Sequence, residues 1–187
     1  MTIIDTSAPE VEQEICRKCG FCCNGTLFLH ACLNEGEKGN LPDMIESSVF
    51  SDGDSDYFKL PCNYFREKCT IYNKIRADVC SAYRCQLLKD LADNKITKIV
   101  ALKVINEASL LCDEILNEFR NLTAKNEVIC FKELPEIILK IINTCNNKKL
   151  KEEFELLLGK CNILEALLIK HIRSAGDFKD LMADSKV

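Results

Sequence analysis

Eight of the thirteen cysteines fall into two groups between residues 16 and 85, and this pattern constrains the fold more than any other feature. The first group is Cys16, Cys19, Cys22 and Cys23, and the second is Cys62, Cys69, Cys80 and Cys85. Thiolates are soft donors that favour zinc, iron–sulfur clusters or Cu(I). The chain has only two histidines, so the cysteines are the candidate ligands. The spacing therefore predicts a metal-binding protein with all eight cysteines as site residues.

The two groups favour different metals. Four thiolates complete either a tetrahedral zinc site or an iron–sulfur cluster. The first group begins with a C-x2-C-x2-C pattern, which is shared with bacterial ferredoxins and favours iron–sulfur. The second group is spread more widely along the chain and favours zinc. Adjacent cysteines point in different directions, so Cys22 and Cys23 are expected to serve different metals, in two four-thiolate sites or in one site plus a reactive pair. The predicted cofactor is an iron–sulfur cluster or zinc.

Two other interpretations of the cysteines are open. A free cysteine behaves as a small apolar residue, so some of the eight would be core fillers, and a disulfide framework would use them in pairs. Cys32, together with His30, is an ambiguous candidate for an outer ligand. The remaining cysteines lie among apolar residues of predicted helices and are expected in the core: Cys112, Cys130, Cys145 and Cys161.

Charge and hydropathy favour a cytoplasmic protein without nucleic-acid or membrane partners. The segment Met1–Asp5 is short and acidic, unlike a signal peptide, and no apolar run approaches the ~20 residues that span a bilayer. The reducing cytosol disfavours disulfides. The net charge is −4, with 9 basic against 13 acidic residues in 1–88 and 16 of each in 89–187, so neither half offers a basic field for nucleic acid.

Helical periodicity begins near residue 89. Apolar residues recur at i, i+3 and i+4 spacing from Ile96 to Phe119, and Pro135 and Gly159 are typical of a helix start and a helix end. The pattern predicts helices over Asp93–Arg120, from Pro135 to Asn146, over Lys148–Leu158 and over Ile163–Ile172. The expected fold is mainly α. An irregular cysteine-rich metal-binding module in residues 1–88 is followed by a C-terminal helical bundle of about four helices in residues 89–187, packed on it.

The first half has weaker secondary-structure signals. Residues 33–56 resemble a loop-rich insertion between the cysteine groups, short strands are expected in Thr26–His30 and Tyr57–Leu60, and a helix in Asn73–Lys89. The acidic run Asp52–Asp56 lacks the glycine and glutamate that a calcium loop requires at its sixth and twelfth positions. We therefore interpret it as a solvated acidic turn.

The cysteine groups resemble a known family. The pattern Cys16-x2-Cys19-Gly-x-Cys22-Cys23, followed by Leu60-Pro-Cys62-x6-Cys69-Thr-Ile-Tyr72-x3-Arg76-x3-Cys80-x2-Tyr83-x-Cys85, is similar to the CxxCxxCC family of zinc- or iron-chelating domains, also called the YkgJ family. The similarity covers roughly residues 14–88. One departure is Ala77, where the family usually has proline. The resemblance implies metal chelation and no particular reaction.

The other positions of the motif have expected physical roles. Gly20 would let the backbone turn closely around a metal, and backbone N–H groups near it would donate to thiolates. Arg76 and Arg84 would neutralise a site. The tyrosines would shield it: Tyr64, Tyr72 and Tyr83.

Three function classes follow. In the first, metal bound by the eight cysteines supports redox chemistry or the modification of a partner protein. In the second, zinc is structural, the helical half binds a protein partner of unknown identity, and no catalysis takes place. In the third, the protein is a thiol-based metal carrier or sensor. Whether the chain is an enzyme stays undecided, because no nucleophile–base pair is recognisable in the sequence.

Overall fold

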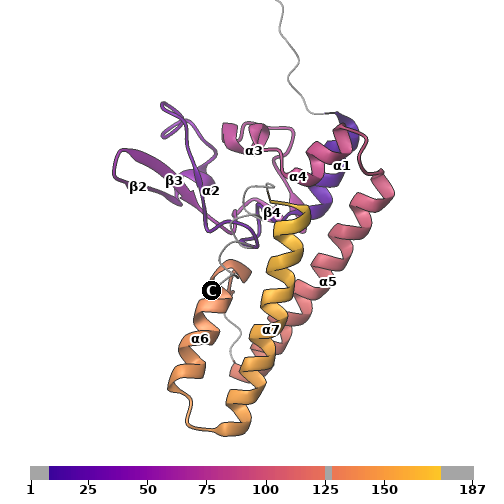
Figure 1. The fold of residues 1–187 in the computed structure, drawn as a ribbon. Helices are drawn as coiled ribbons and strands as arrows, with labels where there is room; N and C mark the ends of the chain where they lie inside the picture. The colour runs from indigo at the N-terminus through magenta and orange to yellow at the C-terminus, as the bar shows by residue number, and fades with distance from the viewer. Residues whose placement is uncertain (1–8, 125–127, 174–187) are drawn as a thin grey trace, which may run out of the picture. The chain divides into compact units, whose positions relative to one another are not determined.

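The computed structural model describes residues 9–124 and 128–173, and this part of the chain is mainly helical (Figure 1). The helices are α1 (Glu10–Cys19), α2 (Asp43–Glu46), α3 (Asp78–Ala82), α4 (Gln86–Ala92), α5 (Lys98–Thr123), the short 3-10 helix η1 (Phe131–Glu133), α6 (Leu134–Thr144) and α7 (Lys148–His171). The strands are β1 (His30–Cys32), β2 (Val49–Asp52), β3 (Ser55–Lys59), β4 (Phe65–Arg66) and β5 (Lys68–Cys69). The mainly α class predicted from the sequence is confirmed. No described helix has the length and apolar character needed to cross a membrane.

The described chain divides into two compact units. The first contains residues 9–84 and 88–98, and the second contains residues 85–87, 99–124 and 128–173. The expected packing of the helical region on the cysteine-rich module stays a prediction.

A three-stranded antiparallel sheet of order β1-β3-β2 forms the regular part of the first unit. Strands β2 and β3 are joined through Gly53 and Asp54, with Asp52 opposite Ser55, so the acidic run forms a two-residue hairpin turn. Gly53 has a φ of 58°, a conformation that glycine adopts without a steric penalty. One face of the sheet packs into a small core, whose buried members are Leu33, Ile45, Phe58, Ile71 and Ala77.

The helices of the second unit bury the apolar stripes that the sequence predicts. On α5 the buried positions recur at helical spacing, and they are Ala101, Ile105, Ala108, Cys112, Ile115 and Phe119. Phe119 packs against Phe154 of α7 with 6.2 Å between ring centroids, and Lys160 of α7 lies 2.6 Å from both Glu114 and Glu118. The later residue of α5, Phe119, contacts the earlier residue of α7, Phe154, whereas the earlier Glu114 pairs with the later Lys160. The two helices are therefore antiparallel.

Two predicted helix boundaries are wrong. The long helix starts at Lys98 instead of Asp93, because α4 ends at Ala92 in a turn whose Asn94 has a φ of 56°. The N–H of Lys95 donates to the carbonyl of Asp90 at 2.8 Å and closes this turn. Asparagine tolerates the left-handed conformation better than most residues, so it ends a helix in the way that glycine does.

Gly159 does not end a helix, although the sequence predicts that it does. Helix α7 runs through it from Lys148 to His171. The buried stripe continues across the glycine, from Phe154 and Leu157 to Cys161 and Leu164. Glycine inside a helix costs about 1 kcal/mol relative to alanine, and burial of one large apolar side chain outweighs that cost. The predicted third and fourth helices are therefore a single helix.

The predicted elements near residues 26–89 are shifted or divided. The first strand lies at His30–Cys32 instead of Thr26–His30, and the predicted helix over Asn73–Lys89 is two short helices, α3 and α4. Of the cysteines expected in the core, Cys145 is partly exposed, and the buried ones are Cys112, Cys130 and Cys161.

Candidate functional site

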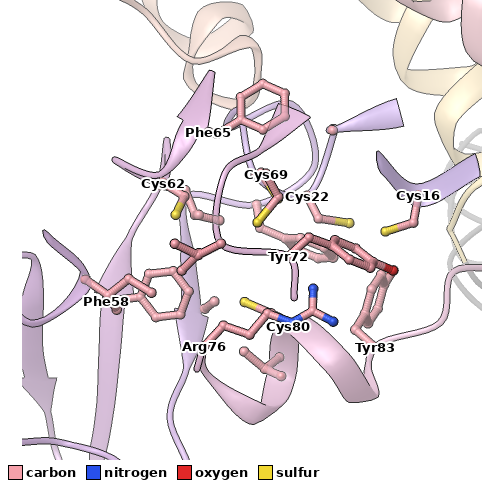
Figure 2. A pocket seen from close by; sticks show the side chains of 18 of the residues that line it. Cys16, Cys22, Phe58, Cys62, Phe65, Cys69, Tyr72, Arg76, Cys80 and Tyr83 are labelled. Atoms are coloured by element: carbon pink, nitrogen blue, oxygen red, sulfur yellow. The ribbon is translucent and has the colours of Figure 1, made fainter. Parts of the chain in front are cut away.

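A cavity of about 280 Å³ in the first unit brings most of the predicted site cysteines together (Figure 2). Its cysteine lining is Cys16, Cys22, Cys23, Cys32, Cys62, Cys69 and Cys80. Its other lining residues are Arg17, Gly20, Phe28, His30, Ala31, Ile45, Phe58, Leu60, Phe65, Ile71, Tyr72, Arg76, Val79 and Tyr83. Among the described residues, no aspartate or glutamate contributes to this lining. The cavity is therefore lined by thiols, apolar side chains, two tyrosines, one imidazole and two guanidiniums.

Six of the eight predicted ligands line this cavity and two do not. The six are Cys16, Cys22, Cys23, Cys62, Cys69 and Cys80. Cys19 lies in the last turn of α1, outside the lining, and Cys85 belongs to the second unit. Thus both cysteine groups contribute to one space, although about 40 residues separate them in the sequence.

The first cysteine group is positioned by the end of α1. Gly20, with a φ of 67°, caps the helix, and its N–H donates to the carbonyl of Cys16 at 3.2 Å. The carbonyl of Gly20 accepts from the N–H groups of Cys23 and Asn24 at 2.8 and 3.0 Å. A Cβ at Gly20 would lie 2.3 Å from Cζ of Phe65. Both the positive φ and this close approach require glycine, so the predicted tight turn at Gly20 is confirmed.

Hydrogen bonds join the second cysteine group to the first. The N–H of Cys62 donates to the carbonyl of Cys23 at 2.7 Å, and the N–H of Phe65 donates to the carbonyl of Cys62 at 2.9 Å. Cys69 lies opposite Phe65 in the β4–β5 pair. The peptide bond between Leu60 and Pro61, just before Cys62, is cis. These contacts hold Cys62 and Cys69 on the same cavity as the turn after α1.

Cys80 is placed by the start of α3. Its N–H donates to the carbonyl of Ala77 at 2.9 Å, and Ala77 is fully buried. Ala77 precedes the helix with a φ of −56°, which lies within the range that a proline ring imposes. Ala77 therefore adopts the backbone conformation that a proline would require, and proline is the usual residue here in the family that the sequence resembles.

Burial favours the protonated form of three of the cavity thiols. It raises the pKa of Cys23, Cys62 and Cys80, and for Cys80 the value reaches about 12. Neighbouring thiols raise the pKa of Cys23 further, because a second negative charge beside the first is unfavourable. The guanidinium of Arg76 acts in the opposite direction on Cys80. A bound cation would reverse this balance, since metals bind the deprotonated thiolate.

The donor chemistry fits a thiolate-bound metal, while the thiols are not arranged as a finished ligand set. Within residues 9–124 and 128–173, no three Cys, His, Asp or Glu side chains are grouped closely enough to hold a metal ion as they stand. All thirteen cysteines, which lie inside these ranges, are thiols instead of disulfides. Soft metals prefer sulfur donors, and the cavity offers sulfur without competing carboxylates.

Aromatic side chains surround the thiols. Tyr72 and Tyr83, two of the three predicted shielding tyrosines, line the cavity, whereas Tyr64 packs against the small core of the first unit. The ring of Tyr83 meets Phe28 edge to face at 5.4 Å. Burial and the nearby Cys16 raise the pKa of Tyr72, so its hydroxyl stays protonated.

Several lining residues were not singled out by the sequence. Phe28, Phe58 and Phe65 reach the cavity from separate elements, and no local signal distinguishes them from ordinary core residues. Arg17 lies between Cys16 and Cys19, and a cation between two candidate ligands was the signal that could have identified it as a lining residue. His30 and Cys32, which the sequence left ambiguous, both contribute to the lining.

Arg84, expected to neutralise a site, has a different contact. Its guanidinium lies 2.5 Å from Oε1 of Glu12, a buried side chain of α1, and Arg84 does not line the cavity.

Comparison with family models, curated proteins and solved structures finds no match to this chain.

Proposed function

We propose that this protein binds a metal ion or iron–sulfur cluster through cysteine thiolates in the cavity of the first unit. The observation that supports this most strongly is the meeting of six cysteines from both sequence groups around one space (Figure 2). Buried apolar fillers have no need to converge, and thiols this close disfavour one another's ionisation unless a cation is present.

We assign the ligand set to the two cysteine groups as wholes. The six thiols of the cavity form its centre, and Cys19 and Cys85 are proposed as the remaining members of the two groups. Metal binding commonly orders its own ligands, because a finished site is rarely stable without the ion. The cofactor is an iron–sulfur cluster or zinc.

The resemblance to the CxxCxxCC family, the YkgJ family, supports the same function. The glycine after the second cysteine has a structural reason here, since Gly20 is required at the end of α1. In this proposal residues 1–88 form a cysteine-rich metal-binding module, and residues 89–187 form a helical bundle. The protein acts in the cytoplasm, where its thiols stay reduced, in redox chemistry or in the modification of a protein partner.

A second candidate function is a structural zinc module with a helical surface for a protein partner. Large apolar side chains are exposed on the two long helices, with Ile99 80% and Leu110 70% exposed on α5 and Leu156 70% exposed on α7. If these side chains form a contiguous patch with their neighbours, that patch would favour contact with another protein. In this case the metal would maintain the fold and take no part in chemistry.

The experiment that tests both candidates is metal analysis with an optical spectrum, on full-length protein purified without oxygen. Iron with labile sulfide and visible absorption supports the first candidate, and colourless protein with stoichiometric zinc supports the second. Cys80→Ser should lower the bound metal, whereas Cys145→Ser, outside the cavity, should not. Protein that contains neither metal, even after reconstitution under reducing conditions, would contradict the proposal.

A further inference from the structure

Two arginines lie against one tyrosine ring at the cavity. The guanidinium carbon of Arg76 is 4.2 Å from the ring centroid of Tyr72, and that of Arg17 is 5.5 Å from the same centroid. Arg17 comes from α1 and Arg76 from the segment before α3, and all three residues line the cavity. Each cation is attracted to the ring face, but two like charges near one ring repel each other.

Neither of these guanidiniums has a carboxylate partner within the part of the chain that the structure describes. Two other arginines show the usual arrangement, since Arg84 pairs with Glu12 and Arg173 pairs with Glu165 at 2.8 Å. A pair of arginines beside an apolar cavity, without a carboxylate, presents donors in the fork geometry that suits carboxylate and phosphate.

The rest of the cavity suits an apolar group attached to such an anion. Its walls include Phe28, Phe58, Phe65 and Tyr83, and its volume is about 280 Å³. That volume is close to the lower end of small-molecule sites, about 300 Å³, and is far larger than the roughly 30 Å³ that one water molecule takes up in the liquid. A single zinc ion, one of the two proposed cofactors, would therefore leave room beside it.

We propose that the cavity binds a small molecule carrying an oxyanion, carboxylate or phosphate, on an apolar body, with Arg17 and Arg76 holding the oxyanion and the phenylalanines holding the body. This inference goes beyond metal binding and is tested separately from it. The competing use of the two charges is compensation of the cysteine thiolates, and the experiment distinguishes the two uses.

The experiment measures binding of benzoate, phenyl phosphate and neutral benzamide to the purified full-length protein by ligand-observed NMR and calorimetry at constant ionic strength. The variants are Arg17→Gln and Arg76→Gln, with Arg76→Lys to keep the charge without the fork. Arg66→Gln is the matched control, because Arg66 is an exposed arginine of the same unit outside the cavity. Metal content and far-UV circular dichroism are recorded for every variant.

We expect benzoate or phenyl phosphate to bind at least tenfold more tightly than benzamide. Arg17→Gln and Arg76→Gln should each weaken the anion at least tenfold, Arg76→Lys should restore it in part, and Arg66→Gln should leave it unchanged. Benzoate preference over phenyl phosphate identifies a carboxylate ligand, and the reverse identifies a phosphate.

Three results overturn the inference: no binding of either anion to folded protein, equal binding of anions and benzamide, or glutamine variants that lose metal while anion binding is unchanged. Protein that takes up no metal on reconstitution but still binds the anion through both arginines would contradict the proposed function alone. Metal-loaded protein that binds no anion would contradict this inference alone.

Discussion

Replacement of Gly20 by alanine tests the turn that positions the first cysteine group. The αL conformation costs an L-residue about 1–2 kcal/mol, and the stiffer unfolded chain returns about 0.4–1 kcal/mol. The new Cβ would also lie 2.3 Å and 2.6 Å from two ring atoms of Phe65, and such overpacking costs about 1–3 kcal/mol. We therefore expect Gly20→Ala to lower the free energy of unfolding by about 2–4 kcal/mol.

Gly36→Ala is the matched control. Gly36 has a φ of 82°, but a Cβ there would meet no atom within 4 Å. Its loss should be about 1 kcal/mol, which is the backbone term alone. In the double variant, Phe65→Leu removes the ring atoms that the new Cβ would meet, so Gly20→Ala should cost less in that background.

The assay is denaturant unfolding followed by tyrosine fluorescence. All four tyrosines lie in the first unit and the chain has no tryptophan, so this signal reports on the unit that contains the turn. Because Cys23 and Asn24 donate to the Gly20 carbonyl, Gly20→Ala should also reduce bound metal. Equal losses of stability for Gly20→Ala and Gly36→Ala would show that the Phe65 ring does not restrict residue 20.

Three further predictions follow from single contacts. Gly159→Ala should raise the free energy of unfolding of the second unit by about 1 kcal/mol in denaturation followed by circular dichroism. Gly159 lies inside α7, and an added Cβ there would meet open space. A loss of stability would contradict the continuous helix. Arg84→Ala should lower the free energy of unfolding by about 2–3 kcal/mol in thermal unfolding, because it leaves the buried carboxylate of Glu12 unpaired. This cost is below that of a fully buried pair, because the Arg84 side chain is 42% exposed. An unchanged midpoint would show that the pair is dispensable. Metal-free protein should lose stability as the pH rises through 9 toward 12. The pKa of Cys80 is about 12 in the folded state against an ordinary value of 9.0, so the folded state binds more protons than the unfolded state in that range. Stability that does not change with pH there would contradict the buried neutral thiol.

The candidate site was predictable from the sequence where the signal is local. The spacing of the cysteines identified both groups, and six of those residues line one cavity. The glycine after Cys19 was recognised as a turn residue, because a backbone reversal at a helix end has few solutions. Metal binding itself stays a prediction, and so does the choice of metal, since zinc and iron–sulfur clusters use the same thiolates.

Helix positions were predictable where apolar periodicity is long, as in α5 and α6. The errors at Asp93 and Gly159 have opposite causes. Asn94 ended a helix through backbone conformation that a periodicity argument does not detect. Gly159 failed to end one because the stripe from Phe154 to Leu164 is buried on both sides of it. Local propensity is weak, and tertiary burial decides between such alternatives.

The two cysteine groups, the mainly α class and the turn at Gly20 were predictable from the sequence, since they depend on residue type and on neighbours a few positions away. The tertiary structure was needed to show which thiols share a cavity, that Phe65 closes over Gly20, and that Arg17 reaches the ring of Tyr72 beside Arg76. The two cysteine groups, Phe65 and Gly20, and Arg17 and Tyr72 are each separated by tens of residues. Their contacts come from the packing of the whole unit, which no local pattern encodes.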